Sequence, residues 1–230
     1  MIYGIIPARL DSTRLPRKLL LAETGKPLIQ HTWESVCRAK SLDAVIVATD
    51  SEEIAAAVLA FGGRVEMTGR HNSGTDRVAE VARGLPDADL IVNIQGDEPE
   101  IDPGHIDKLA GFMLGDEAYQ IGTLATPLED PSPESVVKVV CTTKNRAVYF
   151  SRQPIPTGGP WLQHIGVYAF RPIVLPHFAA IGPQPLEQSE RLEQLRWREW
   201  GFPILVITVD SHATGIDTPE DYWAFVERNR

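Results

Sequence analysis

Short apolar runs alternate with segments of helical periodicity along the first half of the chain. The apolar runs predict strands over Ile2–Ile6, Ala44–Ala48, Val65–Met67 and Leu90–Gln95. Between them, apolar side chains recur three and four residues apart, which predicts helices over Pro27–Ala39, Ile54–Phe61, Thr75–Arg83 and Pro103–Leu114. We expect Asp50 to cap the second of these helices. Such a strand–helix order is typical of a parallel sheet with helices on both faces.

The second half of the chain is less regular. Its apolar runs predict strands over Gly122–Thr126, Val136–Cys141, Ile165–Phe170 and Ile204–Val209, and its periodicity predicts helices over Pro185–Trp200 and Pro219–Arg228. We expect the last helix to pack back on the first sheet through its apolar side. Two proline-rich stretches, Pro127–Pro133 and Pro154–Pro160, could mark a subdomain boundary.

Composition narrows the class of protein. The 230 residues are 43% hydrophobic and 23% charged, which excludes a disordered, collagenous or coiled-coil chain. The net charge of −9 makes a general nucleic-acid or anionic-membrane binder a poor interpretation, and no apolar stretch approaches the roughly 18 residues of a membrane span. The apolar start is too short for a signal peptide, and Cys37 and Cys141 form no disulfide framework, so we expect a cytoplasmic protein.

Ligands of such sheets bind at the carboxyl ends of the strands, so the loops after Ile6, Ala48 and Gln95 are candidates. The first of these loops carries four cations within ten residues, namely Arg9, Arg14, Arg17 and Lys18. Guanidinium groups and an ammonium suit a triphosphate, although a solvated basic loop has the same composition. The chain has no glycine-rich phosphate motif, so side chains would have to bind the phosphates.

Acidic residues follow the apolar run that ends at Gln95. Asp97 lies where a carboxylate can hold Mg²⁺ against phosphates, but it could equally be a turn residue. Asp217 directly precedes Thr218 and Pro219, which form a good helix start, so it could face a site or only help the cap.

Two further groups are ambiguous. Ser73 and Thr75 precede a predicted helix, where small hydroxylated residues allow close approach of a flat base but also serve as N-caps. In the second half, Glu193 and Gln194 point away from the apolar side of their predicted helix. His164, beside a strand, is more often a structural histidine than a ligand.

Ordered motifs at these positions resemble the 3-deoxy-manno-octulosonate (Kdo) cytidylyltransferases, also called CMP-Kdo synthetases. The matching segments are Ile5–Lys18, Gly25–His31, Val47–Asp50, Ser73–Arg77, Asn93–Pro99, Val137–Val140, Tyr149–Pro156, His164–Arg171, Leu192–Arg196 and Gly215–Asp221. Several are weak individually, but together and in order they are specific. The sequence departs from the family pattern at Arg17, where glycine is usual, at Leu19, where proline is usual, and in a shorter loop over Pro156–Gln163.

The resemblance implies an α/β fold of the nucleotide-diphospho-sugar transferase type. The sheet would be mostly parallel, with helices on both faces, in a single domain over residues 1–230. A smaller portion for sugar binding and dimerisation would be inserted at about residues 128–203. It also implies a cytoplasmic homodimer that binds no nucleic acid, is not inserted in the membrane, and makes CMP-Kdo for lipopolysaccharide synthesis.

The resemblance also implies roles for the candidate residues. The residues implied to bind CTP are Arg9, Arg14, Lys18, Ser73, Thr75, Gln95 and Asp97, and Asp97 and Asp217 would hold Mg²⁺. The catalytic set would be Arg9, Lys18, Asp97 and Asp217. The residues implied to line the Kdo site are Arg152, His164, Tyr168, Glu193 and Gln194. Two alternatives stay open: a cytidylyltransferase for an amino-Kdo or sialic-acid-like sugar, and a non-catalytic nucleotide sensor of the same fold.

Overall fold

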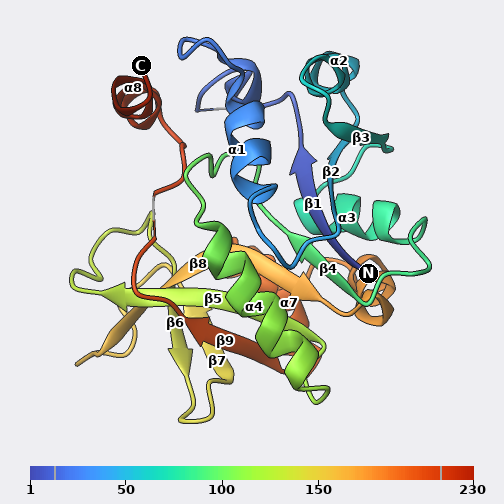
Figure 1. Cartoon of the computed structure of the whole chain (residues 1–230). Helices are drawn as coiled ribbons and strands as arrows, with labels where there is room; N and C mark the ends of the chain where they lie inside the picture. Colours follow the sequence, from blue (N-terminus) through green and yellow to red (C-terminus); the bar gives the residue numbers. More distant parts are fainter. Residues whose placement is uncertain (13, 213) are drawn as a thin grey trace.

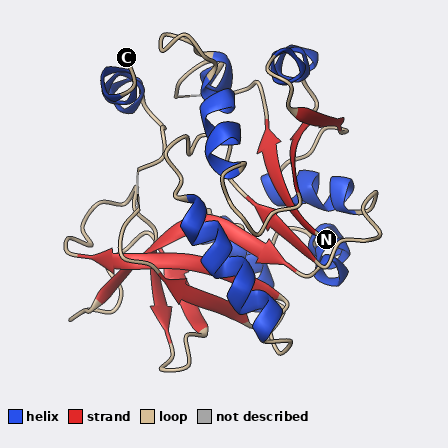
Figure 2. Cartoon of the chain, in the orientation of Figure 1, coloured by secondary structure: helices blue, strands red, loops and turns tan. Residues whose placement is uncertain are grey.

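A single nine-stranded sheet forms the centre of the molecule (Figures 1 and 2). The computed structural model describes residues 1–12, 14–212 and 214–230, so Thr13 of the basic loop lies outside the described residues. The strands are β1 (Ile2–Ala8), β2 (Ala44–Thr49), β3 (Arg64–Met67), β4 (Leu90–Asn93), β5 (Ile121–Leu128), β6 (Lys138–Cys141), β7 (Ala147–Ser151), β8 (Trp161–Phe170) and β9 (Ile204–Thr208).

The strand order is β3-β2-β1-β4-β8-β5-β9, with the β6–β7 pair attached beside β8. Parallel pairing joins β3, β2, β1 and β4, and again joins β5 and β9. Along this path of described strands, β8 alone runs in the opposite direction, because it pairs antiparallel with both β4 and β5. The predicted α/β fold with a mostly parallel sheet is confirmed.

Helices cover both faces of the sheet, as predicted. They are α1 (Leu28–Val36), α2 (Glu52–Ala60), α3 (Gly74–Ala82), α4 (Pro103–Gly115), α5 (Leu175–Ile181), α6 (Pro185–Glu190), α7 (Gln194–Glu199) and α8 (Pro219–Arg228), with short 3-10 helices η1 (Lys18–Leu20) and η2 (Pro172–Val174). Alternate residues of β1 enter different cores: Ile6 packs with α1, α2 and α4, whereas Ile5 packs with α3, α5 and α7.

Three sequence predictions about helices are wrong. The N-cap of α2 is Ser51, whose hydroxyl accepts the Ile54 amide at 3.3 Å, while Asp50 forms an ion pair with Arg77 at 3.0 Å. The predicted helix over Pro185–Trp200 is two helices, because the chain turns through a left-handed residue at Arg191, with φ of 56°. The last helix lies beside α1 rather than on the sheet, with the Phe225 and His31 rings 5.0 Å apart (Figure 1).

The sequence analysis also missed strand β7 and the first half of β8. Both lie in the predicted inserted portion, residues 128–203, where alternation of apolar and polar side chains is weak. The strands of this portion share the central sheet through the β5–β8 pairing. Because this portion is continuous with the central sheet, the boundaries at residues 128 and 203 stay a prediction.

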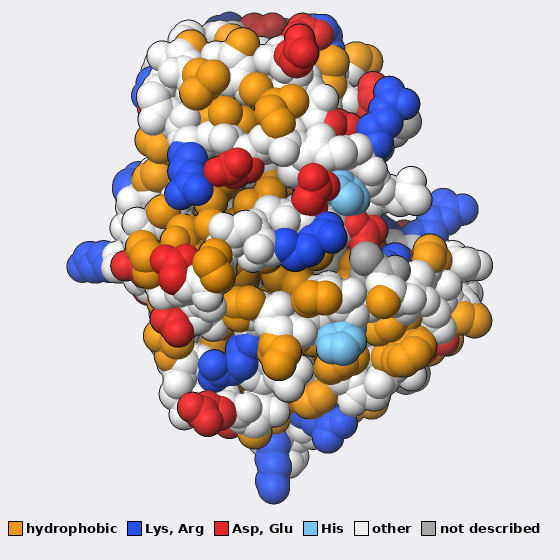
Figure 3. All heavy atoms as spheres, turned by 90° about the vertical axis from the view of Figure 1, so that its right-hand side faces the viewer, with side chains coloured by type: hydrophobic (Ala, Val, Ile, Leu, Met, Phe, Trp, Pro, Cys, Tyr) orange, Lys and Arg blue, Asp and Glu red, His pale blue; other side chains and the backbone are white. Residues whose placement is uncertain are grey.

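Within the described residues, no helix combines the length and the apolar character that crossing a bilayer requires. On the face shown in Figure 3, basic side chains lie singly among acidic and apolar ones rather than forming a continuous basic surface.

The contact of α4 with β5 allows a stability test. A Cβ on Gly122 would lie 2.6 Å from Met113 Sδ and 3.1 Å from Leu109 Cδ1, in a fully buried position. We expect Gly122→Ala to lower the free energy of unfolding by about 1–3 kcal/mol through overpacking. Gly111→Ala, inside α4 with open space around its Cβ, is the control and should raise that free energy by roughly 0.5–1 kcal/mol. Urea unfolding of both variants measures this, and equal effects would contradict the packing argument.

Candidate functional site

The carboxyl edge of β1 and β4 opens into a polar cavity of about 260 Å³. Its lining includes eight of the predicted residues, which are Arg9, Arg14, Lys18, Ser73, Gln95, Asp97, Glu193 and Asp217. The basic loop after β1, the start of α3, the loop after β4 and the segment before α8 all contribute. The structure thus brings together four sequence segments that the motif analysis identified separately.

One ammonium group joins three of these segments. Lys18 is 9% exposed, and its Nζ binds the Asp97 carboxylate, the Ile216 carbonyl at 2.7 Å and Asp217 Oδ1 at 3.3 Å. Arg14 adds a second cation to Asp217 at 2.8 Å. The Ile216 amide also donates to the Asp97 carbonyl at 2.9 Å, which fixes the backbone of both carboxylates relative to each other.

The ambiguity about Asp217 is resolved by its neighbour Asp221. Thr218 is the N-cap of α8 and forms a capping box with Asp221, whose carboxylate also accepts the Asp217 amide at 3.0 Å. Thr218 and Asp221 therefore cap α8, and the Asp217 carboxylate lines the cavity instead. Asp97 likewise contacts Lys18 rather than closing a turn with its side chain.

This pair of carboxylates fits a magnesium ion. Asp97 and Asp217 contact the same ammonium, so their oxygens are close enough to share a cation. Among the described residues, no cluster of three or more His, Cys, Asp or Glu side chains is arranged to hold a metal. Mg²⁺ is usually bound by one or two carboxylates together with water and phosphate oxygens, and Asp97 and Asp217 can supply the carboxylates. Beside them, burial first, and then the charges of Asp97 and Asp217, raise the pKa of Glu98 to about 8.

Arg17 occupies the position where the family usually has glycine. Its φ of 56° is left-handed, a conformation for which glycine is the default. Its guanidinium pairs with Glu53 at the start of α2, away from Lys18. Arg17 thus adopts a conformation that glycine adopts without strain, and its side chain is engaged by α2.

A second cavity, also of about 260 Å³, adjoins the first and shares Gly74, Gln95 and Glu193 with it. Four of the five residues predicted for the sugar line it, namely His164, Tyr168, Glu193 and Gln194. Arg152 is not among its lining residues, and its guanidinium donates to the Glu134 carbonyl at 3.1 Å. Thr75, predicted to contact the nucleotide, lines this second cavity instead.

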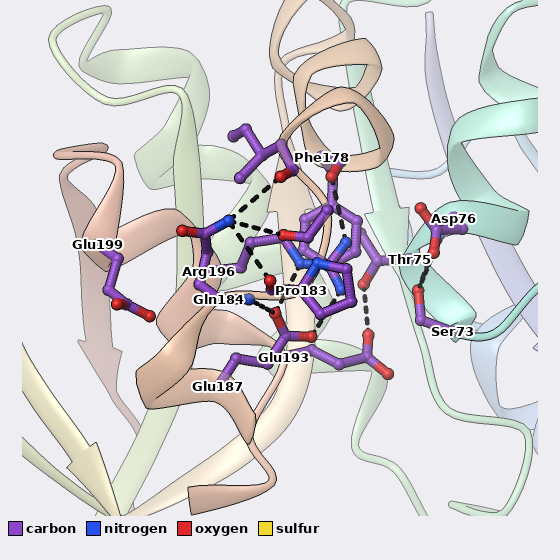
Figure 4. Close-up of polar contacts among 12 residues, drawn as sticks. Ser73, Thr75, Asp76, Phe178, Pro183, Gln184, Glu187, Glu193, Arg196 and Glu199 are labelled. Atoms are coloured by element: carbon purple, nitrogen blue, oxygen red, sulfur yellow. Dashed lines mark hydrogen bonds and ion pairs between the residues drawn. The ribbon is translucent and has the colours of Figure 1, made fainter. Parts of the chain in front are cut away.

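Glu193 is held between the two cavities by α3. The Thr75 hydroxyl donates to its carboxylate at 3.0 Å (Figure 4). Ser73, two residues earlier, caps α3 by accepting the Asp76 amide at 3.0 Å. Ser73 therefore serves as the N-cap, and Thr75 is left to face the site. Burial is the largest cause that raises the pKa of the Glu193 carboxyl, and the charges of Glu187 and Asp76 act in the same direction.

His164 is neutral in this cavity. Burial is the main cause that lowers its pKa to about 3. The Thr123 hydroxyl donates to the Val167 carbonyl at 2.8 Å, so its oxygen accepts from His164 Nε2 at 3.0 Å. That bond puts the ring proton on Nε2 and leaves Nδ1 as a hydrogen-bond acceptor.

Several site residues were missed by sequence reasoning. Arg77 lies in a matching motif but was not singled out; it is buried, lines the first cavity and pairs with Asp50. Asn93 lines the second cavity, and its Oδ1, like the Tyr168 hydroxyl, is buried without a hydrogen-bond partner among the described residues. Unpartnered buried polar atoms at a cavity wall are suited to binding a polar ligand. Arg191 also lines this cavity, and no sequence pattern indicated it.

Residues 3–207 match the family model for cytidylyltransferases, so the chain belongs to that family of nucleotidyltransferases. It is 44% identical to the 3-deoxy-manno-octulosonate cytidylyltransferase of Geobacter metallireducens, over 99% of this chain and 97% of the relative. It is 45% identical to the enzyme of that name from Geotalea daltonii, with the same coverage. A solved structure of CMP:2-keto-3-deoxy-manno-octonic acid synthetase complexed with CTP superimposes with a TM-score of 0.95 at 39% identity, covering 99% of this chain and 97% of that one. Within the cytidylyltransferases, the chain is a member of the 3-deoxy-manno-octulosonate cytidylyltransferase family, as its motifs predicted.

The neutral state of His164 predicts a pH dependence of stability. The folded pKa of about 3 lies below the ordinary histidine pKa of 6.5, so protonation favours the unfolded chain as pH falls below about 6.5. This group should cost about 1.4 kcal/mol of unfolding free energy at pH 5.5 relative to pH 7.5. Other groups, Glu98 among them, also change protonation in this range, but they contribute equally to wild type and variant. From pH 7.5 to pH 5.5, the change in unfolding free energy should therefore be less favourable in the wild type than in His164→Gln by about this amount, as measured by urea unfolding. His177→Gln, at an exposed position, should behave like the wild type, and identical pH dependence in all three proteins would contradict the argument.

Proposed function

We propose that this chain transfers CMP from CTP to the anomeric hydroxyl of Kdo, giving CMP-Kdo and pyrophosphate. The observation that carries the proposal is the pair of adjoining cavities. The first supplies cations and two carboxylates, and the second is lined by hydrogen-bonding side chains, with Gly74, Gln95 and Glu193 common to both. Two substrates bound side by side can meet at that junction.

The reaction needs alignment and neutralisation of charge more than side-chain chemistry. The sugar oxygen attacks the α-phosphorus, an oxygen–phosphorus bond forms, and the bond to the pyrophosphate oxygen breaks. Arg9, Arg14 and Lys18 line the first cavity and offset the negative charge of the triphosphate. Gln95 lines both cavities, which supports a role in orienting the two substrates.

Asp97 and Asp217 would hold Mg²⁺ in this proposal. When bound, the metal would withdraw charge from the phosphate oxygens and ease loss of the hydroxyl proton. In this proposal the two carboxylates exchange Lys18 and Arg14 for the metal. In the free enzyme their charge is balanced by Lys18 and Arg14. With CTP and the metal bound, Lys18 and Arg14 would turn from the two carboxylates to the phosphates.

We also propose that the protein is a cytoplasmic homodimer. Large apolar side chains stay exposed in residues 128–203, with Ile173 at 70% and Trp200 at 58%, which suits a subunit interface. Light scattering on the purified protein tests the dimer.

Pyrophosphate release with each nucleotide and each candidate sugar tests the function. We expect release only with CTP, Mg²⁺ and Kdo together. Turnover of an amino-Kdo or a sialic-acid-like sugar, but not of Kdo, would overturn the choice of sugar. Binding of CTP with no pyrophosphate from any sugar would favour a nucleotide sensor.

Lys18 provides a test of the phosphate loop. Replacing it with Met removes a buried, charge-assisted contact worth about 1.5–3 kcal/mol, so kcat/KM for CTP should fall roughly 10- to 100-fold. Lys40→Met, at an exposed position outside both cavities, is the control and should leave kcat/KM near the wild-type value. Equal effects of the two changes would remove Lys18 from the mechanism.

The two carboxylates should act as one unit. Asp97→Asn and Asp217→Asn each keep the shape of the side chain but remove the negative charge, so each should abolish most turnover with little change in melting temperature. The double variant should be little worse than either single variant, because groups acting together are not additive. We would measure kcat, Mg²⁺ dependence and melting temperature. Normal turnover and unchanged Mg²⁺ dependence in Asp217→Asn would exclude it from the site.

A further inference from the structure

The second cavity has an unusual balance of charge for a site that takes an acid. Glu193 contributes a carboxylate, and His164 contributes a neutral ring. An anionic sugar entering beside Glu193 needs a permanent cation to offset repulsion and desolvation. Among the lining residues that the structure describes, Arg191 is the one lysine or arginine.

Arg191 is also held in a conformation that its residue type disfavours. It follows α6 with φ of 56° and ψ of 48°, where glycine or asparagine is the usual residue. Its amide and that of Leu192 both bond to the Glu187 carbonyl, so the left-handed turn is fixed from both sides. A non-glycine residue in this conformation is strained, and such outliers gather at functional sites.

Within the described residues, the guanidinium of Arg191 makes no ion pair. In the described part of the chain, the arginines in ion pairs are Arg14, Arg17, Arg64, Arg77, Arg196 and Arg228. Arg196 makes the structural ion pair of this region, with two bonds to Glu187 at 2.6 and 2.8 Å (Figure 4). The neighbouring acid Glu190 is engaged by Ser151 at 3.0 Å and by the Arg152 amide at 3.3 Å. Arg191 is exposed and keeps its hydrogen-bonding capacity for a ligand.

We infer that Arg191 binds the carboxylate of the sugar substrate and so selects acidic over neutral sugars at the second cavity. The inference rests on the proposed function, because it assumes that this cavity receives the sugar. Arginine suits the role, since its planar fork matches a carboxylate with two parallel bonds. Arg152, whose guanidinium donates to the Glu134 carbonyl outside the cavity lining, is the competing candidate.

The test compares Kdo with its carboxamide, which lacks the negative charge. The ratio of kcat/KM for the two sugars, at saturating CTP, measures recognition of the carboxylate. We expect Arg191→Met to raise KM for Kdo about tenfold and to shrink this ratio by a similar factor, with KM for CTP and kcat within about twofold of wild type. Arg191→Lys should recover part of the loss, because it keeps the charge but not the fork.

Arg191→Gly separates recognition from structure. Glycine relieves the left-handed backbone, so its melting temperature should equal or exceed that of the wild type while the sugar ratio falls as in Arg191→Met. Arg17→Gly, at the other left-handed arginine, is the matched control and should keep the wild-type ratio.

Three results would overturn the inference. An unchanged ratio in Arg191→Met, with normal turnover of Kdo, would remove Arg191 alone and leave the proposed function standing. Loss of the ratio in Arg152→Met but not in Arg191→Met would assign the carboxylate to Arg152. If none of the acidic sugars supports pyrophosphate release by the wild type, the proposed function and this inference both fail.

Discussion

A buried ammonium group holds the catalytic edge of this protein together. Lys18 lies in a short 3-10 helix after the first strand, and its Nζ bonds to the loop after β4 and to the segment before α8. Without that cation, the Asp97 and Asp217 carboxylates would lie close together with no positive charge between them and would repel each other. The same contacts of Lys18 hold together the residues that we propose to bind a metal and a triphosphate.

The parallel sheet explains why distant segments meet there. β1 and β4 are adjacent and parallel, so the loops that follow them leave the sheet at the same edge. β8 enters between β4 and β5 in the opposite direction, and it carries His164 and Tyr168 next to the same edge. The nucleotide cavity thus depends on parallel crossovers, and the adjoining cavity depends on one reversed strand.

Sequence patterns predicted the first half of the fold well because buried parallel strands are nearly continuous apolar runs. They predicted the second half less well. β7 was missed because it is short and flanked by polar turns, and the break at Arg191 was missed because no glycine marks it. The residues of the first cavity lie in compact motifs and could be named. Asn93, Thr123 and Arg191 could not be named from the sequence. The buried oxygen of Asn93 and the bond from His164 to Thr123 depend on how the side chains are oriented in the fold. The role inferred for Arg191 depends on which other charges line the same cavity.

The hydrogen bond from the Ile216 amide to the Asp97 carbonyl also bears on biosynthesis. Translation produces Asp97 and the basic loop long before it produces Asp217 and α8. A chain that is still being synthesised therefore holds Asp97 and the basic loop before it holds Asp217. If the two carboxylates act together as proposed, turnover requires that the late segment has already docked on the loop after β4.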